Sequence, residues 1–128
     1  MKTGKFSTVI VLAAVISLCA CTHMQAPVSA ESAGRVIDMT ASDFKFEPNN
    51  ITARVGTAIT FRINNTSGIT HNFTLKGPDG EKMKSIDIPA RESVEVHAAF
   101  AKPGTYKFKC DKTGHSELGM QGQVVVSE

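Results

Sequence analysis

The chain has 128 residues, enough for one domain, with 14 Lys or Arg residues against 12 Asp or Glu residues. Lys2 and Lys5 belong to an N-terminal targeting pattern, and without them 12 basic residues balance 12 acidic ones. No basic cluster indicates nucleic-acid binding, and no acidic run indicates disorder.

Residues 1–20 have the pattern of a secretory signal peptide. Lys2 and Lys5 form a short basic region, and a largely apolar run from Val9 to Leu18 follows it. Such a run is too short to span a bilayer comfortably, but it has the length of a signal-peptide core. We therefore expect an exported protein.

The end of this segment, Leu18-Cys19-Ala20-Cys21, resembles the bacterial lipobox, in which Leu stands three residues before an invariant Cys. The resemblance implies that Cys21 is the lipidated first residue of a mature protein anchored to a membrane, in the periplasm or at the cell surface. Cys19 departs from the Ser, Ala or Thr more usual at its position. The alternative is an ordinary signal peptide cleaved nearby, after the stretch that ends at Ala30.

The remaining chain divides into a tether and a domain. Residues 21–34 are mostly small and polar with one proline, which predicts a flexible tether before a domain of residues 35–128. From Arg35 onward, apolar and polar residues alternate with period two, the pattern of half-buried strands. The predicted strands are 36–39, 51–55, 59–63, 73–75, 84–88, 94–100, 106–110 and 123–126. About eight short strands with turn residues between them predict an all-β fold, an antiparallel Greek-key β-sandwich.

Four side chains form a candidate metal-binding set. Cys110, His115 and Met120 have the spacing C-x4-H-x4-M, and His71 lies upstream. A thiolate, two imidazoles and a thioether are the donors of blue copper sites, whereas a thioether is a poor zinc ligand. If Cys21 is lipidated, Cys110 has no disulfide partner in the mature chain, which favours a role as a ligand.

Alternation and glycine placement support this set. Cys110 is in phase with apolar residues of its strand, and so is His71, so both are expected to face inward at strand ends. Gly114 and Gly119 each directly precede a donor and allow a tightly curled loop. By the same alternation His97 faces solvent. Each donor alone is better explained as an ordinary core or surface residue; the joint pattern reverses this and favours the copper site.

The run from Thr40 to Val126 resembles a cupredoxin, the blue copper family. The resemblance is carried by the segments ASDFKFEP, HN, PGTYKFKC, GHSELGM and QGQVVV. The ligand spacing is similar to that of rusticyanin and sulfocyanin. The resemblance implies one copper ion cycling between Cu(I) and Cu(II), held in a plane by His71, Cys110 and His115 with Met120 axial. It also implies that Asn72 ties the two ligand loops together by hydrogen bonds.

The expected function is one-electron transfer in the cell envelope, between redox partner proteins. In the family the edge of the second His ligand is the usual electron port, which here is His115. We expect Ile69, Leu118 and Met120 to form an apolar collar around it. We also expect a monomer that binds no nucleic acid.

Two other functions compete with this prediction. A copper-delivery module would use the same ligands, and a purely structural domain would need none of them. An enzyme is not predicted, because multicopper oxidases and copper nitrite reductases flank the ligand Cys with His residues. Lys109 and Asp111 flank Cys110 here.

Overall fold

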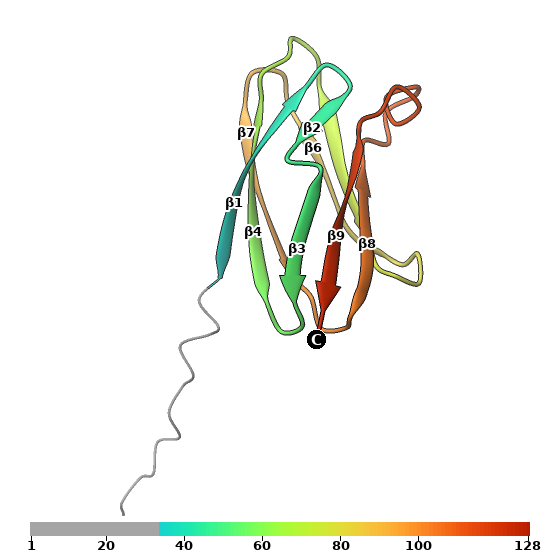
Figure 1. The fold of residues 1–128 in the computed structure, drawn as a ribbon. Coiled ribbons are helices and arrows are strands. Elements are labelled where there is room, and N and C mark those ends of the chain that lie inside the picture. The colour runs from blue at the N-terminus through green and yellow to red at the C-terminus, as the bar shows by residue number, and fades with distance from the viewer. Residues whose placement is uncertain (1–33) are drawn as a thin grey trace, which may run out of the picture.

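The computed structural model describes residues 34–128. The predicted signal peptide (residues 1–20), the lipidation site Cys21 and the tether up to residue 33 lie outside the described residues. The described chain forms nine strands (Figure 1). They are β1 (Arg35–Ser42), β2 (Lys45–Glu47), β3 (Asn50–Arg54), β4 (Ala58–Asn65), β5 (His71–Lys76), β6 (Lys82–Ile88), β7 (Ser93–Ala99), β8 (Gly104–Lys109) and β9 (Gln121–Ser127). Within residues 34–128, no helix has the length and apolar character needed to cross a membrane.

The strands form two sheets packed as a sandwich, which confirms the predicted fold class. One sheet has the order β2-β1-β4-β7 and the other the order β3-β9-β8-β5-β6. The pairing is mixed instead of wholly antiparallel, since β1 pairs with β4 and β3 pairs with β9 in parallel. Alternation shows which face a residue occupies, but it does not show the direction of the neighbouring strand. The strand absent from the prediction is β2, whose three residues are too few for alternation to show.

Apolar residues from both sheets fill the space between them. The predicted inward residues of β4, Ile59, Phe61 and Ile63, are all buried. Phe73 of β5 and Phe108 of β8 stack with ring centroids 5.2 Å apart, and Phe46 of β2 meets both rings edge-on. Such aromatic pairs add to the stabilisation that their buried area provides. The short strand β2 therefore contributes a central part of the core.

At Gly122 the backbone of β9 lies very close to Asn49 and to the ring of Phe108. A Cβ at this position would collide with the carbonyl oxygen of Asn49 and with the ring of Phe108. Glycine thus allows the backbone before β3 to approach β9 closely. This approach lies two residues beyond Met120, one of the predicted ligands.

We predict that Gly122→Ala destabilises the domain by about 1–3 kcal/mol, because the added methyl group overpacks this contact. The free energy of unfolding from urea titration measures the effect. Gly68→Ala is the matched control, since a Cβ at Gly68 meets nothing within 4 Å. Equal stabilities of the two variants would contradict the prediction.

Candidate metal centre

Three of the predicted ligands meet at one end of the sandwich, opposite the C-terminus (Figure 1). His71 begins β5, Cys110 directly follows β8, and His115 lies in the loop between β8 and β9. Their ligand atoms all lie within 4.8 Å of one another. His71 and Cys110 are completely buried, whereas His115 is half-buried.

The distances fit a single metal ion. His115 Nδ1 lies 3.2 Å from His71 Nδ1 and 3.5 Å from Cys110 Sγ. Metal–nitrogen bonds of about 2 Å and metal–sulfur bonds of about 2.3 Å, as at zinc sites, put two ligand atoms of one ion about 3–4 Å apart. One thiolate and two imidazoles in such an arrangement are the donors of a trigonal copper site.

The loop that follows Cys110 brings Met120 back to the same place. The backbone N–H of Cys110 donates to the carbonyl of Met120, and the N–H of Met120 donates to the carbonyl of His115, both at 3.0 Å. Gly114 and Gly119 have φ angles of 81° and 109°, which side chains disfavour and which close the loop. Met120 is completely buried, and these bonds hold its backbone beside Cys110 and His115.

The sulfur of Cys110 accepts a hydrogen bond from the neighbouring strand. The backbone N–H of Asn72 donates to Cys110 Sγ at 3.3 Å. Hydrogen bonds of this kind stabilise the negative charge on the sulfur and tune the potential of a bound copper. The bond also ties the residue after His71 directly to the thiolate.

The side chain of Asn72 joins the ligand loop to two strands. Its Oδ1 accepts hydrogen bonds from the Thr74 hydroxyl at 2.7 Å and from the Asp111 backbone N–H at 3.5 Å. Its Nδ2 donates to the carbonyl of Ile86 in β6 at 3.1 Å. Asn72 thus occupies the bridging position that the cupredoxin resemblance implies.

A buried polar network holds the far side of the His71 ring. Asn65 Nδ2 donates to three carbonyls, those of Ile69, Ile88 and Pro89, at 2.9–3.0 Å. This orientation directs Asn65 Oδ1 to Ser67, whose hydroxyl lies 2.9 Å away. The same hydroxyl lies 2.9 Å from His71 Nε2.

The network selects one tautomer of His71. The acceptors around the Ser67 hydroxyl are Asn65 Oδ1 and the carbonyl of Ile69, so the hydroxyl donates to one of them. Its oxygen then accepts from His71 Nε2–H, which leaves His71 Nδ1 without a proton and facing the other ligands. Burial, and then the nearby charge of His115, lowers the pKa of His71 below its ordinary value. Both effects favour the neutral form that binds metal.

Sequence patterns did not single out Asn65, Ser67 or Phe44. Asn65 ends β4 and Ser67 follows it, and their burial at 1% and 5% exposure depends on the packing of β4 against the β6–β7 connection. Phe44 adopts a positive φ of 60° and packs its ring edge-on against His115, with centroids 5.0 Å apart. The available signal was an Asn and a Ser shortly before a candidate ligand.

The surface around His115 differs from the expected collar. Ile69 and Leu118 are 44% and 64% exposed, whereas Met120 is completely buried. Met120 is therefore not part of the collar, because its main-chain bonds to Cys110 and His115 draw it inward. His97 is exposed on β7, as alternation predicts. Its Nδ1 lies 2.8 Å from the Thr60 hydroxyl.

We predict that Ser67→Ala lowers copper affinity about 10- to 100-fold, because His71 loses the partner that orients it. A competition titration with a copper chelator measures the change. Ser93→Ala removes a serine hydroxyl that bonds Asn64 on the exposed side of β7, and it serves as the control. Unchanged affinity in Ser67→Ala, or an equal loss in the control, would contradict the role assigned to Ser67.

Comparisons with known proteins agree with this architecture. A family model for the cupredoxin-like domain matches residues 8–126. The chain is 32% identical over 117 residues to the copper-resistant cuproprotein CopI of Rubrivivax gelatinosus, covering 78% of this chain and 71% of that protein. It is 32% identical over 88 residues to chloroplastic plastocyanin of Oryza sativa subsp. indica, covering 64% of this chain and about half (54%) of that protein. The structure of auracyanin A, a "blue" copper protein from Chloroflexus aurantiacus, superposes with a TM-score of 0.63 at 25% identity and covers 72% of this chain and 98% of auracyanin A. The chain belongs to the cupredoxin-like domain family.

Proposed function

We propose that this protein is a mononuclear blue copper protein that carries single electrons in the cell envelope. The observation that carries the proposal is the convergence of two imidazole Nδ1 atoms on a buried cysteine sulfur. A copper ion held there supplies reversible one-electron chemistry between Cu(II) and Cu(I). His71, Cys110 and His115, together with the buried Met120, would hold it.

The chain's own residues keep this site rigid and partly open. The Ser67 hydroxyl and the Asn72 N–H restrain His71 and the sulfur, so the ligands have little freedom to rearrange when the charge changes. His115 is half-buried between Phe44 and solvent, and Ile69 and Leu118 expose apolar surface. This edge is suited to brief contact with a redox partner.

A single group of potential metal ligands favours electron transfer over multicopper catalysis. Within residues 34–128 the grouped His, Cys and acidic ligands form a single cluster, at His71, Cys110 and His115. The multicopper oxidase mco of Staphylococcus aureus is 29% identical, but the match covers only 25% of that protein. A coupled second copper centre would need histidines beside the ligand cysteine, where this chain has Lys109 and Asp111.

A second candidate function is copper binding for delivery or tolerance, which the similarity to CopI favours. The two functions differ in what the protein releases. Purified protein that exchanges electrons rapidly with a small redox mediator while retaining its copper supports the carrier. Protein that passes Cu(I) to a chelator of moderate affinity and binds Cu(II) without strong colour supports delivery.

We predict that Cys110→Ser abolishes the intense visible absorption that the wild type develops on addition of Cu(II). A hydroxyl does not replace the thiolate whose charge transfer to copper produces the band. His97→Ala is the control, because His97 is exposed on β7 and outside the cluster. A Cys110→Ser protein as blue as the wild type would end the blue copper proposal.

We predict that Met120→Leu retains copper and colour but raises the reduction potential. The thioether donates weakly to copper, so its removal destabilises Cu(II) more than Cu(I). Voltammetry of both proteins measures the shift. An unchanged potential would place Met120 outside the coordination sphere.

The proposed location is a membrane surface, with attachment through acyl chains on Cys21. Several chains on one cysteine give stable anchoring, since each buried CH₂ contributes about 0.8 kcal/mol. Cys21→Ala should therefore move the protein from the membrane to the soluble fraction without loss of copper binding. Cell fractionation with immunoblotting measures this. Wild-type protein found wholly in the soluble fraction would contradict the anchor and leave the copper proposal intact.

A further inference from the structure

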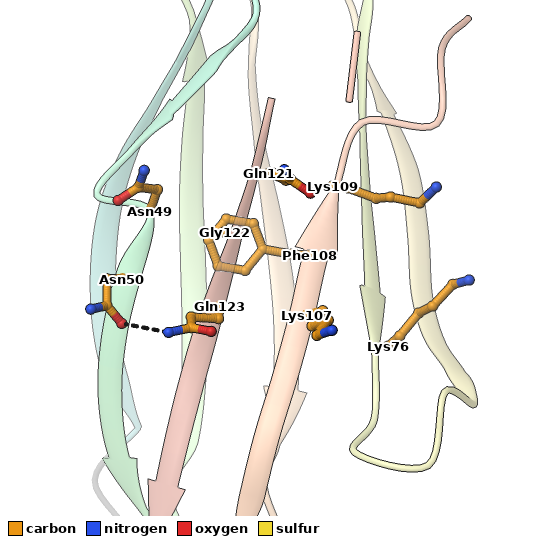
Figure 2. Close-up of a pocket in the computed structure, with 9 residues that line it drawn as sticks. All are labelled: Asn49, Asn50, Lys76, Lys107, Phe108, Lys109, Gln121, Gly122 and Gln123. Carbon is orange, nitrogen blue, oxygen red and sulfur yellow. Dashed lines mark hydrogen bonds between the residues drawn. The ribbon is translucent and has the colours of Figure 1, made fainter. Parts of the chain in front are cut away.

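A hollow of about 500 Å³ lies on the five-stranded sheet, close to the metal centre (Figure 2). Its lining contains three lysines, four amide side chains and no carboxylate; the residues are Asn49, Asn50, Lys76, Lys107, Phe108, Lys109, Gln121, Gly122 and Gln123. Figure 2 shows the amides along β9 and at the beginning of β3, and the lysines along β8 and β5. We refer to this hollow as the lysine dish.

Two lysines of the dish, Lys76 and Lys107, lie directly opposite each other on paired strands. Lys76 of β5 is the register partner of Lys107 in β8 on one side and of Lys82 in β6 on the other. Like charges directly opposite each other on paired strands are destabilising. Lys109 is paired with Asp111 at 3.1 Å, but among the described residues no carboxylate pairs with Lys76 or Lys107. The isolated domain therefore retains an unfavourable charge arrangement on this sheet.

Charge is distributed differently on the two sheets. The strands β3, β9, β8 and β5 contain no acidic residue, and their cations are Arg54, Lys107, Lys109 and Lys76. In the other sheet Lys45 pairs with Glu47 at 2.7 Å and Arg62 with Asp38 and Glu95 at 3.1 and 3.2 Å, while Arg35 donates to the carbonyl of Thr52. The positive charge of the dish is thus a local feature of a domain whose charges otherwise nearly balance.

We propose that the lysine dish is a docking surface for a protein partner that presents a carboxylate-rich segment. Carboxylates would relieve the opposition between Lys76 and Lys107, and the amides of the dish would pair with the partner's polar groups. A membrane surface fits less well, because none of the exposed large apolar side chains lines the dish. An acidic partner is therefore the occupant that the charges and the lining favour.

Two residues of the dish are sequence neighbours of the proposed metal ligands. Lys109 and Gln121 are register partners on β8 and β9, and they directly precede Cys110 and follow Met120. A partner seated there contacts residues one position from two proposed ligands. This surface is separate from the apolar edge formed by Ile69 and Leu118. Its significance for electron transfer rests on the proposed function, whereas the binding itself does not.

The test is a titration of the full chain with a decaglutamate peptide, followed by backbone amide chemical shifts in NMR. Shifts should gather on β5, β8 and β9 around the dish and decline with added salt. Lys76→Gln combined with Lys107→Gln should weaken binding about tenfold. Lys84→Gln combined with Lys102→Gln removes the same charge from exposed residues outside the dish and should have little effect.

Two results would overturn the proposal. Equal weakening by both double variants, or shifts spread over all lysines, would indicate non-specific attraction. Binding to phosphatidylglycerol vesicles that requires Lys76 and Lys107, with no binding of the peptide, would indicate a membrane-facing surface. The titration is run with Cu(I) and without metal, so a failure to bind copper leaves the peptide result readable. The proposed function and the docking surface can therefore fail separately.

Discussion

The antiparallel pairing of β5 with β8 is the constraint on which the metal centre depends. Thr74 lies opposite Lys109, so the beginning of β5 lies beside the end of β8. This register brings His71 next to Cys110 and allows the Asn72 N–H to reach the cysteine sulfur. A register slip by one residue would turn every side chain of a strand to the opposite face. The stack of Phe73 in β5 on Phe108 in β8 opposes such a slip, because both rings are completely buried in the hydrophobic core.

Burying a histidine requires partners for both ring nitrogens, and the fold supplies them from different elements. One nitrogen faces His115 and the other contacts Ser67. Ser67 is in turn held by Asn65, whose amide group donates to the carbonyls of Ile88 at the end of β6 and of Pro89 directly after it. No buried side-chain nitrogen or oxygen of the described residues lacks a hydrogen-bond partner. The buried polar side chains around His71 are therefore held by hydrogen bonds as firmly as the apolar core is held by packing. A ligand held in this way moves little.

The two sheets differ in how their positively charged side chains are paired. The sheet of β2, β1, β4 and β7 pairs Lys45 and Arg62 with its own carboxylates, whereas the sheet that contains both β5 and β8 leaves Lys76 opposite Lys107. Near the site, the side chain of Thr74, and then that of Lys109, hold the pKa of the Asp111 carboxyl below its usual range. Asp111 therefore stays ionised at neutral pH and moderates the charge of Lys109 beside the ligand cysteine.

The sequence predicted every strand of the domain except β2, and it supplied the candidate ligands. Period-two alternation is local, so it identified the strands and the inward direction of His71 and Cys110, and the spacing of Cys110, His115 and Met120 predicted a single loop of ligands. Only the tertiary structure decided that β5 and β8 are neighbours, that β1 and β4 run parallel and that β2 completes the core, since partner choice depends on contacts between distant segments. For the same reason the sequence patterns did not single out Asn65, Ser67 or Lys76. Their roles come from neighbours that folding brings beside them.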